Sequence, residues 1–238
     1  MLRLSETDRV FILTGAGVSA ESGIPTFRGV GGLWRHYRIE EVASPYAWKR
    51  DPVLVWEFYS MRRRVAAEAK ANPAHLALAG LESRLGDRLF LCTQNVDNLH
   101  EQAGSQRVFH MHRELFKSRC DSCQRPPFSD TNVYEPPTPV PGCECGGSIR
   151  PQICWFGEVP FDMERIFNHL QECTIFMAIG TSGVVEPAAS FAALARRNAR
   201  TIYVGPEDPA NRSAFTECYL QNAGEILPQL FQFDGKAS

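Results

Sequence analysis

The chain has 238 residues, of which 44% are hydrophobic and 22% charged, and this composition excludes a disordered chain and allows one large domain with a sizeable core. Its 25 Lys and Arg nearly balance its 27 Asp and Glu, so the net charge of −2 argues against stable nucleic-acid binding through a broad basic surface. We find no apolar run near the roughly 20 residues that span a bilayer and no signal peptide, and we expect a cytoplasmic protein without membrane contact.

Short apolar runs alternate with helical patterns along most of the chain, and this alternation predicts a parallel sheet. The expected strands are residues 10–14, 89–93, 108–112, 174–179 and 201–204. The expected helices are residues 51–70, 73–86 and 187–198, and the first has a favourable start in Asp51 followed by Pro52. Residues 30–50 are rich in glycine, aromatic and charged residues, so we expect mainly loop there.

Residues 118–149 interrupt this alternation with a proline- and cysteine-rich insert that has too few apolar residues for its own core. Its cysteines form two close pairs, Cys120-x-x-Cys123 and Cys143-x-Cys145. Four thiolates can close a tetrahedral structural zinc site, and a disulfide pair or incidental thiols are the alternatives. We expect zinc, because an insert without a core has few other ways to become ordered. The other four cysteines are expected to be core thiols: Cys92, Cys154, Cys173 and Cys218.

A glycine turn, Gly15-Ala16-Gly17, follows the first expected strand. Such a turn lets backbone N–H groups approach a phosphate closely. The third glycine, Gly23, comes later than in the usual dinucleotide fingerprint, and no acidic residue ends a strand about 20 residues further on. Taken alone, the turn fits a nucleotide site and an ordinary α/β connection equally well.

Five further segments favour the nucleotide site over the ordinary connection. In chain order they are residues 24–29 (IPTFRG), 93–100 (TQNVDNLH), 111–112 (MH), 155–158 (WFGE) and 180–182 (GTS). Together with the glycine turn they resemble the sirtuin family over residues 10 to about 190. The resemblance implies an NAD-dependent protein-lysine deacylase with an α/β fold, in which a Rossmann-like parallel sheet has helices on both faces and a small domain combines a zinc ribbon with a helical module.

Domain boundaries follow from the same resemblance. Residues 1–29, 71–115 and 150–238 would form a discontinuous NAD-binding domain. Residues 30–70 would form the helical module of the small domain, and residues 116–149 its zinc ribbon. The implied partners are acylated lysine side chains of proteins and peptides. Since no coiled coil or apolar seam is evident, we expect a monomer.

The resemblance also assigns the NAD-binding residues. They come from the glycine turn and the loop after it, from the segment after the second strand, from the turn after residue 179, and more loosely from a late position. These residues are Gly15, Ala16, Gly17, Glu21, Pro25, Phe27, Arg28, Gln94, Asn95, Val96, Asp97, Gly180, Thr181, Ser182 and Ala223.

His112 matches the catalytic base of the family, with Asn95 and Asp97 as polar groups beside the reacting ribose. An imidazole titrates near neutrality and can accept a proton at cellular pH. In the implied mechanism the acyl oxygen attacks C1′ of the nicotinamide ribose, nicotinamide leaves, and His112 draws a proton from the ribose hydroxyls. The products would be deacylated lysine, nicotinamide and O-acyl-ADP-ribose. His100 and His110 are expected to be structural histidines.

Two segments bear on the substrate. Tyr59 and Arg62 stand three residues apart on one helix face, and Tyr-x-x-Arg here resembles the sirtuin branch that removes succinyl and malonyl groups. A guanidinium and a hydroxyl suit a terminal carboxylate, although an ordinary solvated basic helix also fits the pattern. Arg63 and Arg64 are expected to be surface charges. The segment thought to pair with the substrate peptide by strand addition comprises Trp155, Phe156, Gly157 and Glu158.

Two positions depart from the family pattern. Arg113 follows the catalytic histidine where glycine is common, so a positive φ there would strain the backbone and the guanidinium would lower the affinity of His112 for a proton. Gly205 stands where the family usually has an asparagine that contacts the adenosine ribose. Two alternatives stay open: an NAD-dependent ADP-ribosyltransferase that uses the same cofactor pocket on another nucleophile, and a non-enzymatic NAD-binding protein whose chemistry Arg113 has weakened.

Overall fold

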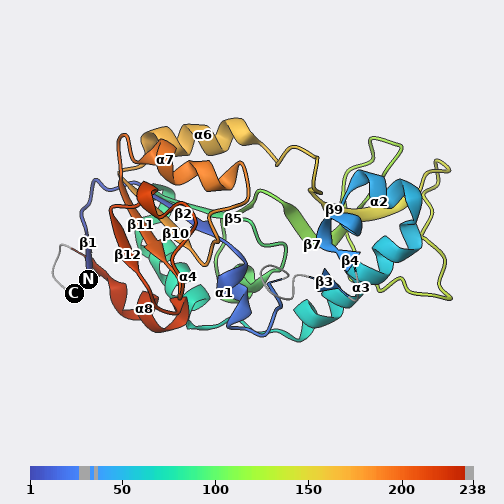
Figure 1. The fold of residues 1–238 in the computed structure, drawn as a ribbon, viewed down its shortest axis with the longest axis horizontal. Coiled ribbons are helices and arrows are strands. Elements are labelled where there is room, and N and C mark those ends of the chain that lie inside the picture. Colours follow the sequence, from blue (N-terminus) through green and yellow to red (C-terminus); the bar gives the residue numbers. More distant parts are fainter. Residues whose placement is uncertain (27–32, 35–36, 234–238) are drawn as a thin grey trace.

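The computed structural model describes residues 1–26, 33–34 and 37–233. Its main sheet has six parallel strands in the order β12-β11-β10-β2-β5-β6 (Figure 1). The predicted parallel sheet and its five expected strands are confirmed, but the strand expected over residues 108–112 ends at His110 because the chain turns at Met111 and His112. The strands are β2 (Val10–Thr14), β5 (Leu89–Thr93), β6 (Val108–His110), β10 (Ile175–Ile179), β11 (Arg200–Val204) and β12 (Glu217–Tyr219).

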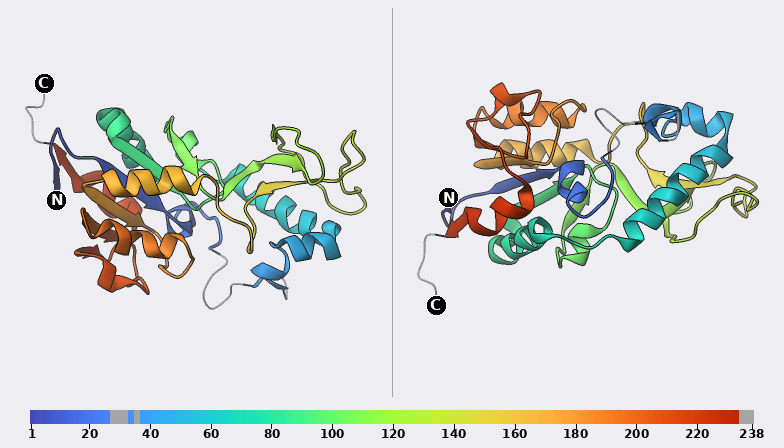
Figure 2. Two further views of the ribbon diagram at one scale, coloured as in Figure 1. Left: turned by 90° about the horizontal axis from the view of Figure 1, so that it is seen from above. Right: turned by 60° about the horizontal axis from the view of Figure 1, so that its bottom comes forward.

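Helices cover both faces of this sheet (Figures 1 and 2). Side chains alternate across a strand, so Val10 and Ile12 pack with α4 and α8, whereas Phe11 and Leu13 pack with α6 and α7. The expected helix over residues 187–198 is shorter than predicted, because Asn198 N–H bonds to the carbonyl only three residues back and ends the regular turns. The helices are α4 (Pro73–Leu85), α6 (Met163–Glu172), α7 (Phe191–Ala195) and α8 (Ala223–Leu230).

A small domain lies at the opposite end of the molecule from the two termini (Figure 1). It packs two helices on a three-stranded antiparallel sheet of order β8-β7-β9. The Asp51 carboxylate accepts a hydrogen bond from Leu54 N–H (3.0 Å), which confirms the predicted start of the long helix. Its elements are α2 (Pro45–Arg50), α3 (Pro52–Glu68), β7 (Arg113–Cys120), β8 (Phe128–Ser129), β9 (Ile149–Ile153) and the hairpin β3 (Leu33–Trp34) with β4 (Tyr37–Arg38).

Several elements were not predicted from the sequence. The α2 helix falls in residues 30–50, where loop was expected, and Ser44 caps it by accepting from Ala47 N–H. The two ends of the chain pair as a parallel two-stranded sheet. The remaining elements are short: β1 (Leu2–Leu4), β13 (Phe231–Phe233), α1 (Ala16–Ala20), α5 (Leu99–Gln102) and the 3-10 turns η1 (Ile39–Glu41), η2 (Gly86–Arg88), η3 (Ala188–Ser190) and η4 (Arg212–Ala214).

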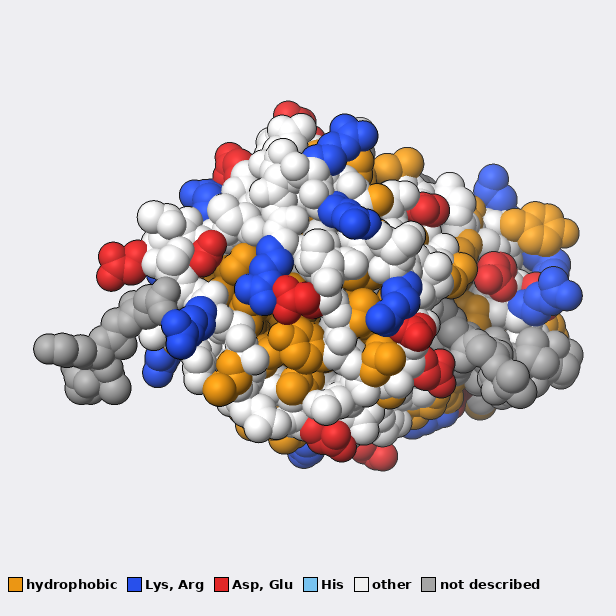
Figure 3. Space-filling model, turned by 60° about the vertical axis from the view of Figure 1, so that its left-hand side comes forward, with side chains coloured by type: hydrophobic (Ala, Val, Ile, Leu, Met, Phe, Trp, Pro, Cys, Tyr) orange, Lys and Arg blue, Asp and Glu red, His pale blue; other side chains and the backbone are white. Residues whose placement is uncertain are grey.

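The surface at the end that carries the termini has positive and negative side chains interspersed (Figure 3). Of the four scattered cysteines, Cys92 and Cys173 are buried as predicted, whereas Cys154 and Cys218 are only half-buried, so the prediction of core thiols is wrong for these two. Within residues 1–26, 33–34 and 37–233, none of the helices has the length and apolar character needed to cross a membrane.

Candidate active site

Two glycine turns meet at the carboxyl ends of the adjacent strands β2 and β10. Gly15 N–H donates to the Ile179 carbonyl (2.9 Å) and Gly17 N–H to the Gly180 carbonyl (2.8 Å). A Cβ on Gly15 would lie 2.8 Å from the Gly180 oxygen, and one on Gly180 would lie 2.5 Å from the backbone nitrogen of Val18. The turns therefore interlock only as glycines, in the crevice where open α/β sheets bind ligands.

We expect Gly180→Ala to damage this junction. Gly180 has φ +62, a conformation that costs a residue with a Cβ about 1–3 kcal/mol, and the new methyl group would also push against the first turn. Urea unfolding should show the loss of stability, and the KM for NAD should rise. Gly80→Ala is the matched control, because nothing lies within 4 Å of a Cβ there and helical alanine is favoured over glycine. A Gly180→Ala protein with the stability and KM of the parent would contradict this account of the turns.

The segment after β5 joins the first glycine turn through buried polar side chains. Asn95 Nδ2 donates to the Gly15 carbonyl (3.0 Å) and to Ser19 Oγ (2.9 Å), and Ser19 Oγ donates to Asp97 Oδ2 (2.9 Å). Asn95 and Asp97 are 8% and 7% exposed. Sequence reasoning missed Ser19, and its one available signal was a small polar residue one turn of helix after Gly15.

Two histidines near this segment are buried and hydrogen-bonded, in line with the structural role expected for them. His100 Nε2 lies 3.0 Å from Thr14 Oγ1, and burial holds the pKa of His100 well below its usual range. His110 bonds to the Asn95 carbonyl (3.0 Å) and to Glu101 (2.8 Å). Burial opposes its charged form, but the Glu101 carboxylate outweighs this and raises the pKa of His110.

His112 lies in the turn between β6 and β7. Its Nδ1 is 3.0 Å from the Gln94 carbonyl oxygen. A carbonyl only accepts hydrogen bonds, so Nδ1 must carry the proton of the neutral ring and Nε2 is left as the basic nitrogen. The half-buried ring is thus oriented by the same segment that supplies Asn95 and Asp97.

Arg113 has φ +68, so the strain anticipated from the sequence is present. Its guanidinium carbon lies 3.7 Å from the centroid of the Phe161 ring, a cation–π contact worth about 0.5–2 kcal/mol. Backbone bonds clamp the turn on both sides, from Cys154 N–H to the His112 carbonyl (3.0 Å) and from Phe161 N–H to the Met111 carbonyl (2.9 Å). The turn is therefore held in place despite the unfavourable residue.

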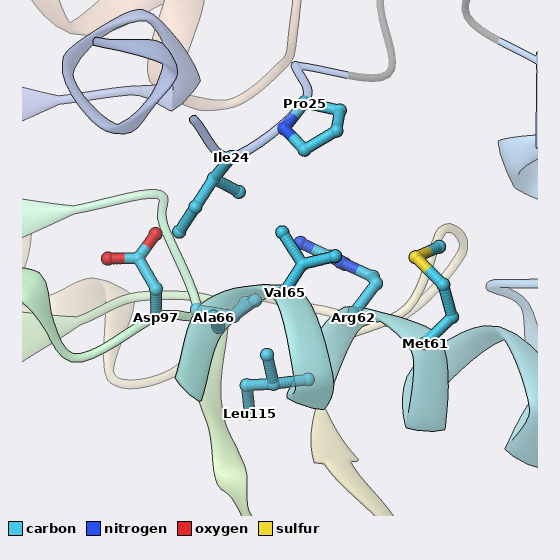
Figure 4. Close-up of a pocket in the computed structure, with 9 residues that line it drawn as sticks. Ile24, Pro25, Met61, Arg62, Val65, Ala66, Asp97 and Leu115 are labelled. Atoms are coloured by element: carbon cyan, nitrogen blue, oxygen red, sulfur yellow. The ribbon is translucent and has the colours of Figure 1, made fainter. Parts of the chain in front are cut away.

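A pocket separates α3 from the NAD-site candidates (Figure 4). Arg62 and Asp97 enter it from opposite sides. Tyr59, on the same helix as Arg62, is fully buried. Its hydroxyl accepts a hydrogen bond from Trp155 Nε1 (3.0 Å), and burial raises the pKa of Tyr59 to about 12. The pocket is lined by Ile24, Pro25, Met61, Arg62, Val65, Ala66, Val96, Asp97 and Leu115.

The structure corrects the expectation for one of the neighbouring arginines. Arg63 is 1% exposed and not a surface charge, because it turns into the small domain and pairs with Asp130 (3.1 Å). Arg64 is at the surface, as predicted, where it forms a two-point ion pair with Glu135. Successive helical residues point about 100° apart, so three adjacent arginines can have three different environments.

The segment expected to pair with the substrate follows β9, which is an edge strand of the small-domain sheet. Trp155 is buried, Phe156 is 40% exposed and Gly157 has φ +90. Glu158 accepts from Trp155 N–H (2.8 Å) and pairs with Arg150 (2.8 Å), so its carboxylate closes the turn. Only Phe156 of the two aromatic side chains is presented outward.

The remaining predicted NAD residues surround the glycine turns. Glu21 accepts from Gly224 N–H (3.1 Å) and so lies beside Ala223 at the start of α8. The Ser182 carbonyl accepts from Ala210 N–H (3.1 Å), and the Thr181 carbonyl accepts from Tyr203 Oη (3.4 Å). The same tyrosine hydroxyl lies 2.4 Å from where a Cβ on Gly205 would be. Phe27 and Arg28 lie outside the described residues.

The four insert cysteines converge. Their Sγ atoms all lie within 4.8 Å of one another, with Cys120–Cys145 at 3.5 Å and Cys123–Cys143 at 3.9 Å. These separations exclude disulfides, which need about 2.05 Å, and match the roughly 3.8 Å between sulfurs around a tetrahedral zinc ion. N–H groups of Cys123 and Ser122 hydrogen-bond to Cys120 Sγ and lower its pKa to about 6, which favours the thiolate that zinc binds.

Comparisons with known proteins agree on one family. The Sir2 family model matches residues 15–187. A protein of Caulobacter vibrioides named NAD-dependent protein deacylase is 47% identical over 224 residues, which cover 92% of this chain and 94% of that protein. One of the same name from Escherichia coli K12 is 45% identical over 230 residues, covering 95% and 82%.

Solved structures give the same result. A Sir2 homologue in complex with NAD superposes with a TM-score of 0.86 at 41% identity, covering 94% of this chain and 89% of that one. A Sir2 protein with a deacetylated p53 peptide and 3′-O-acetyl ADP-ribose has a TM-score of 0.82 at 28% identity, covering 92% and 90%.

Proposed function

The chain belongs to the Sir2 family and is an NAD-dependent protein deacylase, and we propose that it removes succinyl and malonyl groups, as well as acetyl groups, from protein lysines. Membership of an enzyme family whose relatives are named for this activity sets aside the alternative of a non-enzymatic NAD-binding protein. The observation that carries the acyl preference is the position of Arg62 in the wall of the pocket, facing Asp97.

NAD fits the crevice on the evidence of its glycines. At Gly15, Gly17 and Gly180 a Cβ would meet backbone at 2.8 Å or less, so the two turns pack together without side chains over them. When bound, NAD would supply an electrophilic ribose carbon and nicotinamide as the leaving group. Zinc has a structural role, since four cysteines fill all positions of a tetrahedral site: Cys120, Cys123, Cys143 and Cys145.

The proposed catalytic roles follow from the hydrogen bonds of the site. The Gln94 carbonyl holds the proton on Nδ1 of His112, which leaves Nε2 to take a proton from a ribose hydroxyl. Asn95 and Asp97 are fixed by Ser19, so the Asp97 carboxylate is held at one side of the pocket. O-acyl-ADP-ribose, nicotinamide and the free lysine are the proposed products.

The acyl chain would enter between Arg62 and the loop around Asp97. An Arg guanidinium offers paired N–H donors to a terminal carboxylate, whereas an acetyl group has no charge to bind. A phenol keeps its proton at neutral pH, and burial raises the pKa of Tyr59 further, so its hydroxyl has a proton to donate while it accepts a hydrogen bond from Trp155. Residues 155–158 extend from an edge strand, which supports pairing of the peptide with this segment.

The proposed domain division keeps residues 1–29, 71–115 and 150–238 as the NAD-binding domain and residues 30–70 and 116–149 as the two modules of the small domain. The grouping of α2 and α3 with the zinc insert in one hydrophobic cluster supports the two-module small domain, but Leu115, Ile153 and Trp155 belong to the same cluster, so the small domain extends beyond these boundaries to all of β7 and β9. The site then lies where the two domains meet, with α3 on one side and the ends of β2, β5 and β10 on the other.

Arg62→Met tests the acyl preference. A hydrogen bond to a charged group contributes about 1.5–3 kcal/mol, so we expect kcat/KM for succinyl peptide to fall about 10- to 100-fold while kcat/KM for acetyl peptide stays within about twofold. Arg64→Met is the matched control, because Arg64 lies next in sequence but is exposed and paired with Glu135. Equal losses on both peptides in Arg62→Met would refute the assignment.

A further inference from the structure

Arg63 joins α3 to β7 and to the zinc-bearing insert through five hydrogen bonds, three of them fully buried, which match the five N–H donors of its guanidinium. The side chains of Arg63 and Asp130 are each 1% exposed. The acceptors are the carbonyls of Leu115 (3.0 Å), Lys117 (3.3 Å) and Asn132 (2.6 Å), Ser118 Oγ (3.0 Å) and Asp130 Oδ2 (3.1 Å).

One of these acceptors belongs to the pocket that Arg62 lines. Leu115 accepts from Arg63 Nε through its carbonyl, donates its N–H to the Val96 carbonyl (2.7 Å), and lines the pocket with its side chain (Figure 4). Val96 and Asp97 line the same pocket. Leu115, a residue of β7, therefore connects the face of α3 that carries Arg63 to the loop that carries Asp97.

The anchored face of α3 is distinct from the pocket face. Trp56 Nε1 donates to the Ile149 carbonyl (3.0 Å) and Ser60 Oγ to the Tyr134 carbonyl (3.1 Å), so Trp56, Ser60 and Arg63 form one stripe at spacings of four and three residues. Arg62 is turned about 100° from Arg63, toward the pocket. Arg63, which makes more of these hydrogen bonds than Trp56 or Ser60, is the immediate neighbour of Arg62 in the sequence.

We propose that Arg63 and Asp130 are positioning residues that fix where Arg62 stands in the pocket, and so determine the preference for acyl chains that end in a carboxylate. This inference rests on the proposed function. A guanidinium recognises a carboxylate only within about 0.5 Å of the productive geometry, whereas an acetyl group does not use the guanidinium. Asp130 lies between the two cysteine pairs, so the zinc insert contributes to substrate choice.

The test measures the ratio of kcat/KM for succinyl peptide to kcat/KM for acetyl peptide. Loss of folded protein lowers both rates equally and leaves the ratio unchanged, so the ratio separates positioning from stability. Asp130→Asn and Arg63→Lys should lower the ratio roughly tenfold, mainly through the KM for succinyl peptide. If either variant fails to fold, the double variant R63M/D130L replaces the buried pair with apolar residues of similar volume and supplies the ratio.

Arg62→Met, measured in parallel, separates the possible failures. If Arg62→Met lowers the ratio and the variants of Arg63 and Asp130 do not, the positioning role is overturned and the proposed function stands. If Arg62→Met itself leaves the ratio unchanged, the acyl preference and the positioning role are both overturned. A lowered ratio in all of these variants, with acetyl activity per folded molecule preserved, supports the inference.

Discussion

Replacing His112 by tyrosine is expected to lower kcat for every acyl peptide by a factor of about 10² to 10⁴, the contribution typical of a positioned general base. Tyrosine has a similar size but holds its proton at neutral pH, so it cannot take one from a ribose hydroxyl. Backbone hydrogen bonds from Cys154 and Phe161 hold the turn that carries His112, so the fold and the glycine turns should be unaffected. The KM for NAD should therefore change little.

His169→Tyr is the control for this experiment. His169 lies on α6 and stacks on Phe90 (3.9 Å between ring centroids), and a tyrosine ring can keep that stacking. The control should retain full activity. Undiminished deacylation by the His112→Tyr enzyme would contradict the role of His112, whatever the outcome for His169→Tyr.

Replacing Cys143 by serine is expected to have the largest effect on stability. Structural zinc sites contribute about 10–16 kcal/mol of binding free energy to folding, and a serine hydroxyl is a poor substitute for a thiolate. Zinc content should fall from one ion per chain to near zero, and the melting temperature should drop. Because the insert supplies Asp130 to the buried Arg63, we also expect kcat/KM for succinyl peptide to fall at least tenfold.

Cys218→Ser is the matched control for the zinc site. Cys218 is a half-buried thiol on β12, outside the cysteine cluster, so its variant should keep one zinc ion and the parent melting temperature. Elemental analysis and a thermal scan measure both quantities. Full zinc occupancy in Cys143→Ser, or loss of zinc with an unchanged melting temperature, would contradict the structural role of the metal.

The sequence predicted the parts of the fold that local patterns determine. Strands β2, β5 and β10 are continuous apolar runs, and residues of such runs are buried on both faces of a parallel sheet. Asp51 and Pro52 mark the start of α3 because capping is a local interaction. The short α2 helix was missed, since six residues are too few for a helical period to stand out.

The errors of the sequence-based prediction within the site have a different cause. Arg63 reads as one of three adjacent surface arginines, and its burial depends on acceptors at Leu115 and Asp130, more than 50 residues away in the chain. Ser19 likewise has its partners, Asn95 and Asp97, in another segment. Pairings between distant segments are set by tertiary structure, and the residue type alone does not reveal them.

The most direct test of the account measures nicotinamide release and acyl loss side by side, on acetyl-lysine and succinyl-lysine peptides of one sequence, with and without NAD. The account predicts that both acyl groups are lost only with NAD present, with one nicotinamide released for each acyl group removed. Acyl loss without NAD, or nicotinamide release that does not depend on the acyl group, would contradict it.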